Sequence, residues 1–315
     1  MTAHRDGQSR RIGGAGEEAV DEMSREHRQA LERLRAGWGR MDGRVALVTG
    51  ATRGIGLETA VRLGELGADV LVHGRDHGRG AAALAAVRAA SALAAAPALY
   101  VADLSTIAGV RRLAAEVVRD RWHLDVLVAN AGVFAPERRE TPDGLEVTFA
   151  VNVVAPVLLA AELLAVLRVA APARIVILSS ASHWTGEIHW NDLQLAAPGA
   201  YSGLRAYDQS KLAVLMLTLA LSRRLKGSGV SAVCLDPGDV ATSMLASGWP
   251  GLDGISIADG AVTSVYLASA PEAAGVSGAY FEAGAAVTPL GAALDVAAQE
   301  RLWNLVEQLA GPLGV

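Results

Sequence analysis

The chain is organised around a strand, a glycine-rich turn and a helix near its amino-terminal end. Val45 to Val48 form an apolar run typical of a buried strand, and glycines follow at positions 50, 54 and 56 before a helical pattern begins. Glycine permits a tight turn and close approach of the backbone to a pyrophosphate, while the helix offers unpaired N–H groups and a positive dipole end. Dinucleotide-binding turns require this order, although an ordinary strand-to-helix turn can have the same spacing.

Apolar runs alternate with helical patterns along the rest of the chain. Strands are predicted at residues 68–73, 98–101, 124–130, 174–178, 230–235 and 279–281, and helices at 79–95, 105–121, 145–169, 206–226, 257–268 and 294–310. Continuously apolar strands separated by helices indicate a parallel sheet covered on both faces. The predicted fold is therefore α/β, a Rossmann-like doubly wound parallel β-sheet with helices on both faces. With no linker or repeat evident, we expect residues 41–315 to form a single domain that includes the substrate site.

Residues 1–40 are expected to form an N-terminal extension. Its first part is polar and glycine-rich, whereas residues 17–38 carry apolar side chains at roughly helical spacing, among them Leu31, Leu34 and Trp38. Such a helix could pack on the domain or on a partner subunit. The segment could equally precede a natural start at Met41, and the sequence does not separate these alternatives.

Composition narrows the functional classes. Apolar residues make up 51% and charged residues 19% of the 315 residues, which favours a folded core over disorder. The net charge of −5 and the absence of a basic cluster argue against nucleic acid as a partner. The single cysteine, Cys234, excludes an intrachain disulfide or a cysteine-based metal site, and it fits a reducing cytoplasm.

No secretory signal or membrane span is expected. Residues 1–40 lack an apolar core segment. The longest apolar stretch, residues 149–170, is interrupted by Asn152, Pro156, Glu162 and Arg168, and charges inside a membrane are costly. A buried helix is the better interpretation of this stretch.

A second group of polar residues lies at the predicted carboxyl ends of strands. Asn130 and Ser180 end two of these strands, at the edge where ligands bind in such sheets. Tyr207 and Lys211 are four residues apart on a predicted helix and so share one face. A neighbouring ammonium lowers a phenol pKa from its usual value of about 10, which would fit Tyr207 for general acid–base catalysis. Taken alone, this spacing is also common on solvated helix faces.

Together, in this order, these features resemble the short-chain dehydrogenase/reductase family over about residues 42–310. The matching residues are Thr49, Gly50, Gly54, Gly56, Asp103, the Asn130–Ala131–Gly132 run, Asn152, Ser180, Tyr207, Lys211, Pro237 and Gly238. Residues 174–180, 192–194, 221–227 and 278–281 are similar to the retinol-dehydrogenase and WW-domain-oxidoreductase branch.

The resemblance implies hydride transfer between NAD(P) and a carbonyl or alcohol. Tyr207 would pass the proton, Lys211 would hold the nicotinamide ribose and tune Tyr207, and Ser180 would bind the substrate oxygen. Asn152 would anchor a water that relays the proton, and Ser179 competes with Ser180 for its role. The cofactor would contact Gly50, Thr52, Arg53, Gly54, Ile55, Gly56, Arg75, Asp103, Leu104, Asn130, Ala131, Gly132, Tyr207, Lys211, Pro237, Gly238, Val240 and Thr242.

The end of the second strand bears on cofactor choice. Relatives that use NAD usually carry an acidic residue there, whereas this chain has Gly74 followed by Arg75, with Arg53 in the glycine turn. Two guanidiniums suit a 2′-phosphate, so NADP(H) is the preferred cofactor, with NAD(H) as the alternative. If both arginines are merely surface charges, this preference has no basis.

The substrate is expected to be a hydrophobic carbonyl or alcohol. The segment between Ser180 and Tyr207 and the loop after Gly238 supply Trp184, Trp190, Trp249, Met244, Leu245, Leu252 and Ile255, although core packing explains the same residues. His183 and His189 lack accompanying carboxylates, so no metal is expected.

Two other functions compete with that of an oxidoreductase. A non-catalytic NAD(P)-binding sensor or scaffold would share the fold, but such proteins generally lose Tyr or Lys of the pair. A sugar-nucleotide epimerase would space its glycines differently. A homo-oligomer is compatible with the sequence.

Overall fold

The computed structural model describes residue 26, residues 28–91 and residues 97–315, and within them one sheet forms the centre of the molecule. Its strand order is β3-β2-β1-β4-β5-β6-β7-β8. The strands are β1 (Val45–Val48), β2 (Asp69–Gly74), β3 (Ala98–Val101), β4 (Val126–Ala129), β5 (Ala173–Leu178), β6 (Val230–Asp236), β7 (Tyr280–Glu282) and β8 (Ala285–Val287). All neighbouring strands are parallel except β8, which pairs antiparallel with β7.

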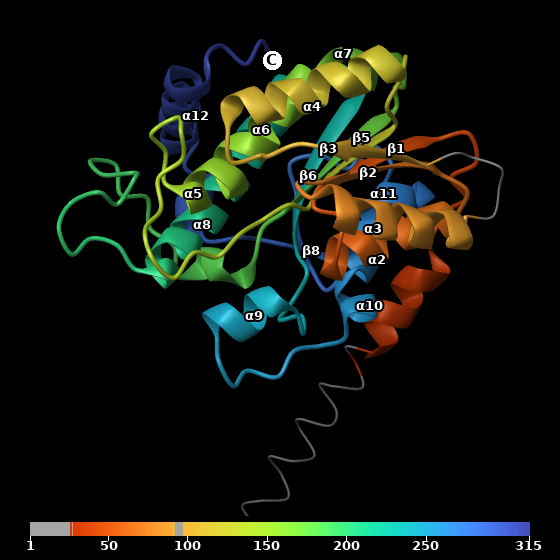
Figure 1. The fold of residues 1–315 in the computed structure, drawn as a ribbon, viewed down its shortest axis with the longest axis horizontal. Helices are drawn as coiled ribbons and strands as arrows, with labels where there is room; N and C mark the ends of the chain where they lie inside the picture. Colours follow the sequence, from red (N-terminus) through yellow and green to blue (C-terminus); the bar gives the residue numbers. More distant parts are fainter. Residues whose placement is uncertain (1–25, 27, 92–96) are drawn as a thin grey trace, which may run out of the picture.

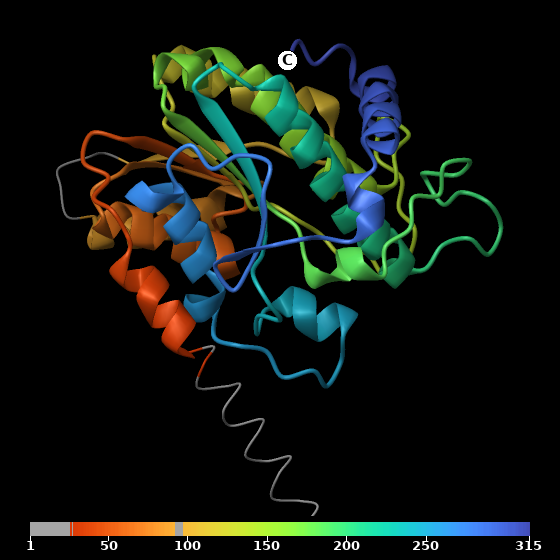
Figure 2. The same cartoon turned by 180° about the vertical axis from the view of Figure 1, so that it is seen from behind.

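Helices cover both faces of the sheet (Figure 1). One layer contains α4 (Ile107–Asp120), α5 (Val147–Phe149), α6 (Ala155–Glu162), α7 (Leu164–Val169), α8 (Gly203–Arg224) and α12 (Val296–Ala310). The other contains α2 (Gly54–Glu65), α3 (His77–Ala90), α10 (Ile257–Gly260) and α11 (Val262–Ser269). The short helix α9 (Ser243–Gly248) stands apart from both layers, as the view from behind also shows (Figure 2).

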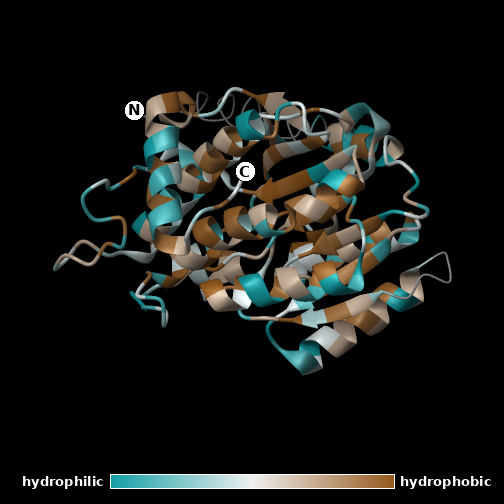
Figure 3. Ribbon diagram, turned by 90° about the horizontal axis from the view of Figure 1, so that it is seen from above, coloured by the Kyte–Doolittle hydropathy of each residue, from teal (hydrophilic) through white to brown (hydrophobic). Residues whose placement is uncertain are grey.

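The sheet separates two apolar clusters. Leu47 and Leu127 point into one cluster, and their strand neighbours Val48 and Val128 point into the other. Because both sheet faces are buried, most strand residues are apolar, and the strands lie as a hydrophobic layer between helices with polar outer faces (Figure 3). The predicted fold class is therefore confirmed.

Several predicted elements differ from the observed ones. The helix predicted at 145–169 is divided into α5, a π-helical segment η1 (Ala150–Val154), α6 and α7. Pro156 lies in the first turn of α6, where a missing N–H is tolerated, whereas inside a continuous helix it would break the hydrogen-bond ladder. The helix predicted at 257–268 is divided into α10 and α11, and α3 ends at Ala90 rather than at residue 95. The part of that prediction at 92–95 lies outside the described residues.

One strand and one α-helix of the described chain were not predicted at all. Strand β8 is only three residues long and partly exposed, and it follows a turn at Ala283 and Gly284, so its apolar run is too short to signal a strand. Helix α9 is six residues long and buries only Leu245. Neither has the periodicity from which sequence patterns predict structure.

The described part of the N-terminal extension forms a helix over residues 28–36 that packs on the domain. Leu31 is buried, and Leu34 lies against Gly284, where an added Cβ would collide with it. Arg35 forms an ion pair of 2.6 Å with Asp259 at the start of the α10 region. Of the segment predicted as helical, residues 17–25 and 27 lie outside the described residues.

We therefore expect removal of residues 1–40 to destabilise the domain. Burying a leucine is worth about 1.5–3 kcal/mol, so loss of Leu31 and Leu34 should lower Tm by roughly 5 °C or more. Thermal unfolding measures this, with Leu31→Ala as a single substitution and the exposed Glu32→Ala as its control. Unchanged Tm in the truncated protein would show that the helix contributes nothing to stability.

Candidate active site

The glycine turn after β1 packs tightly against the end of β4. Gly50 has a φ of 65°, and a Cβ there would lie 2.9 Å from Ala131 Cα. A Cβ at Gly56 would collide with the Asn130 side-chain amide and lie 2.6 Å from the Gly50 carbonyl oxygen. Asn130 Nδ2 in turn donates to the Thr49 carbonyl at 2.8 Å, and Ala131 N donates to Thr49 Oγ1 at 3.0 Å. These hydrogen bonds and close contacts hold the turn against β4, at the point where the strand order reverses. Sheets of this kind bind ligands at that point.

Helix α2 begins at Gly54 without a capping side chain. Gly54 has a φ of 56°, and the N-cap residue, Arg53, has no side-chain acceptor that could cap the first turn. The N–H groups at this helix end are thus available to an anion. Together with the close-packed glycines, this donor set fits a dinucleotide pyrophosphate.

His73 also lies at the glycine turn, although the sequence did not predict it. It is buried in β2, where its Nδ1 accepts from Gly50 N at 3.2 Å and its Nε2 lies 3.1 Å from the Ala102 carbonyl oxygen. Burial lowers the pKa of His73 to about 4, so the ring is neutral and Nε2 donates. The one available signal was a polar residue at the end of an apolar strand.

Other predicted cofactor residues lie on the turns that follow β3 and β6. Asp103, after β3, is exposed and accepts from Ser105 N at 2.9 Å, while Leu104 is buried. After β6, Gly238 has a φ of 81°, and Val240 forms a parallel bridge with Ile255.

Thr242 joins this last turn to the glycine turn. A Cβ at Gly54 would lie 3.5 Å from the Thr242 methyl group, and the Thr242 side chain accepts from Leu245 N at the start of α9. The segments after β1 and β6 therefore meet, as predicted for the carboxyl edge of the sheet.

Arg53 and Arg75, on which the prediction of NADP(H) rests, are exposed. Among the residues that the structure describes, neither Arg53 nor Arg75 has an ion-pair partner. Gly74 is covered by the Thr52 side chain, with which an added Cβ would collide. Thr52 therefore packs over the end of β2, and Gly74 is required for that packing.

Ser180, Tyr207 and Lys211 come together between β5 and α8. The Ser180 hydroxyl acts to lower the pKa of the Tyr207 phenol, whereas Ser179 is buried and its hydroxyl donates to the Lys211 carbonyl at 2.8 Å. Lys211 Nζ lies 5.3 Å from the centre of the Tyr207 ring and donates to the Leu178 carbonyl at 3.1 Å. Of the two serines, Ser180 is the one beside the phenol.

The expected lowering of the Tyr207 pKa was wrong. Burial raises the pKa of Tyr207, and the negative charge of Asp236 raises it further, while the Ser180 hydroxyl acts in the opposite direction. Lys211 is itself fully buried within the core, and burial lowers its pKa to about 8. The spacing along α8 predicted that Lys211 lies near Tyr207. It carried no information about the carboxylate of Asp236, which is at the end of β6.

Asn152 lies within the π-helical segment η1 and ties it to two neighbours. Its Oδ1 accepts from Val133 N at 2.8 Å, and its Nδ2 donates to the Val133 carbonyl and to Ser210 Oγ, both at 3.0 Å. π-helical turns are rare and frequently occur at functional sites. Asn152 thus fixes the loop after β4 against α8, beside Gly132, whose Cβ would lie 3.5 Å from Asn152 Oδ1.

Three aromatic rings meet at Tyr207. Phe134, from the loop after β4, lies 5.9 Å from the Tyr207 ring, and Trp249, at the end of α9, lies 5.3 Å from it, centre to centre. Phe134 and Trp249 are 5.5 Å apart. Phe134 was not predicted because it follows the Asn130–Gly132 run with no pattern of its own.

Of the three tryptophans expected to wall the substrate, only Trp249 borders Tyr207 in the ring contacts of the described chain. Trp190 stacks on Arg301 of α12, and Trp184 donates to Glu282 at 3.1 Å. His183 is buried and lies between the Ser180 carbonyl and the Leu290 N–H, so it is a core histidine.

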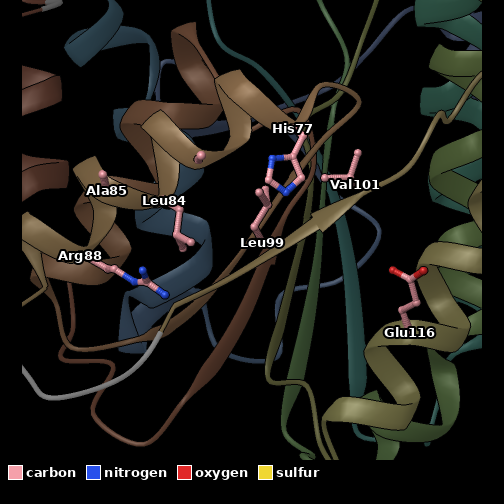
Figure 4. A pocket seen from close by; sticks show the side chains of 8 residues that line it. His77, Leu84, Ala85, Arg88, Leu99, Val101 and Glu116 are labelled. Atoms are coloured by element: carbon pink, nitrogen blue, oxygen red, sulfur yellow. The ribbon is translucent and has the colours of Figure 1, made fainter.

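A hollow of about 760 Å³ lies elsewhere, beside edge strand β3 (Figure 4). Its walls include His77 and Arg88 of α3, Leu99 of β3 and Glu116 of α4. It contains none of the predicted site residues, so it is not the site described above. No helix within the described parts of the chain is long and apolar enough to cross a membrane.

Several known proteins are similar to this chain in sequence. The family model for short chain dehydrogenases matches residues 44–193. Retinol dehydrogenase 14 of Homo sapiens is 36% identical over 311 residues, 90% of this chain and 91% of the relative. Polyprenol dehydrogenase of Mus musculus is 39% identical over 288 residues, 86% of this chain and 85% of the relative.

Several solved structures are similar to this chain in fold. An uncharacterised protein from Mycobacterium Paratuberculosis has a TM-score of 0.68 and 32% identity, covering 87% of this chain and 96% of its own. Pseudomonas aeruginosa RhlG, in an active-site complex with NADP, has a TM-score of 0.63 and 27% identity, covering 78% of this chain and 96% of its own.

The chain belongs to the short-chain dehydrogenase/reductase family. Within that family it falls in the retinol-dehydrogenase-like branch, as the sequence resemblance predicted, and it is an NAD(P)-dependent enzyme acting on CH–OH and C=O groups.

Proposed function

We propose that this protein is an NADP(H)-dependent oxidoreductase that interconverts a carbonyl and an alcohol on an apolar small molecule. The observation that carries the proposal is the Ser180–Tyr207 hydroxyl pair, set against Phe134 and Trp249 on one side and Lys211 on the other. A proton donor beside an apolar wall suits reduction of a carbonyl that is bound through its hydrophobic part.

Each polar group then has a distinct task. A bound nicotinamide supplies or accepts the hydride. Tyr207 gives its phenolic proton to the carbonyl oxygen, or takes it back during alcohol oxidation, and Ser180 holds that oxygen by a hydrogen bond. Lys211 keeps positive charge near the phenol ring, and Asn152 holds the loop after β4 in place. The raised pKa of Tyr207 keeps the proton available at neutral pH, which suits the reducing direction.

The preference for NADP(H) is supported by charge at the glycine turn. Arg53 and Arg75 are exposed on either side of Thr52 and Gly74, with no carboxylate at the end of β2. Guanidiniums bind phosphate through a planar fork, so these side chains suit a 2′-phosphate. Binding of NADP by the structural neighbour RhlG agrees with this choice.

The apolar substrate class is supported by two observations. The rings of Phe134 and Trp249 border the reactive phenol, and Met244 Cε would lie 3.9 Å from a Cβ at Gly132. Two relatives are named for retinol and polyprenol, which are long apolar alcohols. A retinoid or polyprenoid alcohol or aldehyde is therefore the first choice of substrate.

The deciding experiment is a substrate panel. Retinal, a polyprenal and small water-soluble aldehydes are tested with NADPH and NADH, and the matching alcohols with NADP⁺ and NAD⁺. We expect the highest kcat/KM for an apolar carbonyl with NADPH. Tight NADPH binding without turnover of any member would instead support a non-catalytic sensor or scaffold.

Replacing Trp249 with alanine should separate large from small substrates. Removing a ring that packs on the apolar part of a substrate costs at least about 1.4 kcal/mol, or tenfold in kcat/KM for an apolar aldehyde. A small aldehyde that does not reach the ring should be nearly unaffected. Trp190→Ala, which removes a tryptophan stacked on Arg301 instead, is the control. Equal losses for large and small aldehydes would contradict a role for Trp249 in substrate choice.

A further inference from the structure

The segment between β6 and α10 forms a loop whose two ends are joined by hydrogen bonds. Ile255 N donates to the Asp239 carbonyl oxygen at 2.7 Å, and Ala241 N donates to the Ile255 carbonyl oxygen at 2.9 Å. We call residues 239–255 the α9 loop, because it contains α9. Among its residues 241–254, all of which the structure describes, only Leu245 is buried. A segment with so few buried side chains has little stability of its own, so its shape depends on what holds its two ends.

The α9 loop contributes to both the reactive centre and the cofactor site. The Trp249 ring lies 5.3 Å from the Tyr207 ring, centre to centre, and the Thr242 methyl group would lie 3.5 Å from a Cβ at Gly54 in the glycine turn. In the proposed reaction the nicotinamide lies beside Tyr207. Arg75 would hold the 2′-phosphate at the end of β2, which β1, β4 and β5 separate from β6. The α9 loop therefore borders the nicotinamide half of the cofactor.

Helix α10 fixes the joined ends of the loop. Ser256, which directly follows the loop, caps α10: its Oγ accepts from Asp259 N at 3.0 Å and donates to Asp259 Oδ2 at 2.7 Å. Gly260 packs so closely on Val240 that a Cβ there would lie 2.4 Å from Val240 Cγ2. A shift of α10 would consequently move both ends of the α9 loop.

The N-terminal helix at residues 28–36 holds α10 from the outside. Arg35 Nη2 lies 2.6 Å from Asp259 Oδ1, the carboxylate oxygen that Ser256 does not use. One residue earlier, Leu34 packs against Gly284 in the turn between β7 and β8, where an added Cβ would collide with it. The helix is thus attached to the end of the sheet, and Arg35 extends this attachment to α10.

We propose that Arg35 is a positioning residue that acts through Asp259 and α10 to hold the α9 loop in the shape that binds the nicotinamide half of the cofactor. A loop that adopts its binding shape for only part of the time lowers the apparent affinity by that fraction. The N-terminal helix thereby supports the cofactor site as well as the stability of the domain. This inference rests on the proposed function for the identity of the cofactor.

Arg35→Ala should weaken binding of the whole cofactor but not of its adenosine end. The Arg35 and Asp259 side chains are 37% and 34% exposed, so their ion pair contributes modestly, and we expect Kd for NADPH to rise about two- to fivefold. Fluorescence titration measures this without any turnover. Adenosine 2′,5′-bisphosphate reaches only the end of β2, so its Kd, measured by calorimetry, should not change. With saturating NADPH, kcat should be nearly unchanged, because the bound cofactor orders the loop.

Three further variants test the path from Arg35 to the loop. Arg35→Lys keeps the charge and should recover most of the NADPH affinity. Asp259→Asn should raise Kd for NADPH as Arg35→Ala does, and the double variant should be no worse than either single one, since both remove the same interaction. Arg33→Ala is the matched control: Arg33 is an exposed arginine on the same helix, and both affinities should stay at the wild-type value.

The fragment comparison separates positioning from a general loss of structure. Equal weakening of NADPH and adenosine 2′,5′-bisphosphate, additive losses in the double variant, or an unchanged Kd for NADPH in Arg35→Ala would overturn the proposal. So would loss of folded protein in both Arg35→Ala and Asp259→Asn by circular dichroism, which would assign the ion pair to the fold alone. If the wild type binds NADH in place of NADPH, the proposed cofactor choice fails, and the same comparison with NADH and AMP still decides the role of Arg35.

Discussion

Replacement of Tyr207 by phenylalanine should lower kcat by about 100-fold or more while leaving NADPH affinity nearly unchanged. General acid–base catalysis is typically worth 10²–10⁴-fold, and the substitution removes only the phenolic oxygen that carries the proton. The ring would keep its contacts with Phe134 and Trp249, so the site should retain its shape. Turnover of the best aldehyde from the panel and NADPH titration by fluorescence measure the two quantities.

Tyr201→Phe is the matched control for this prediction. Its hydroxyl donates to the Ala135 carbonyl at 2.7 Å, so the same oxygen is lost from a tyrosine that has no contact with Ser180 or Lys211. This variant should keep most of its activity. A Tyr207→Phe enzyme with more than about a tenth of wild-type kcat would remove Tyr207 from the proton-transfer step.

The second large effect is expected on cofactor choice. Arg53→Ala and Arg75→Ala should each raise KM for NADPH by about tenfold, since a charge-assisted hydrogen bond is worth roughly 1.5–3 kcal/mol, and the double variant should lose more. KM for NADH should hardly change, because NADH lacks the 2′-phosphate. The measurement is kcat/KM with both cofactors at fixed ionic strength, because exposed charges are screened by salt.

Arg79→Ala serves as the control for the two arginines. Arg79 is exposed near the start of α3 but lies 3.5 Å from the Asp76 carboxylate, so its charge is already compensated. An equal rise of KM for NADPH and NADH in the Arg53 and Arg75 variants, or a wild-type preference for NADH, would contradict the assignment. Gly74→Asp is a poor test of the same idea, because its Cβ would displace Thr52 as well as add a charge.

Local patterns predicted most of the sheet. β1 and β3 have the predicted bounds, and the bounds of the other five parallel strands differ by one or two residues, because a strand buried on both faces must be continuously apolar. The proximity of Tyr207 and Lys211 was also predictable, since helical spacing alone puts them on one face.

What could not be predicted depends on contacts between distant segments. Phe134 lies in the loop after β4 and Trp249 at the end of α9, so their rings meet only in the folded chain. Burial of Tyr207 among several segments, with a smaller contribution from the charge of Asp236 on a different strand, reversed the direction of the expected pKa shift. Patterns within one element carry no information about such neighbours.

Because position 56 contacts the Asn130 side chain, the residues that one of these positions tolerates depend on the residue at the other. A side chain at position 56 would displace the Asn130 amide, which pairs with the Thr49 carbonyl. A smaller residue at position 130 would relieve that collision but not the 2.6 Å approach to the Gly50 carbonyl oxygen, and it would leave the Thr49 carbonyl without this partner, at a cost of about 1–3 kcal/mol if buried. Glycine at position 56 is therefore required by the backbone of the turn and by the asparagine that joins β1 to β4, as well as by any phosphate.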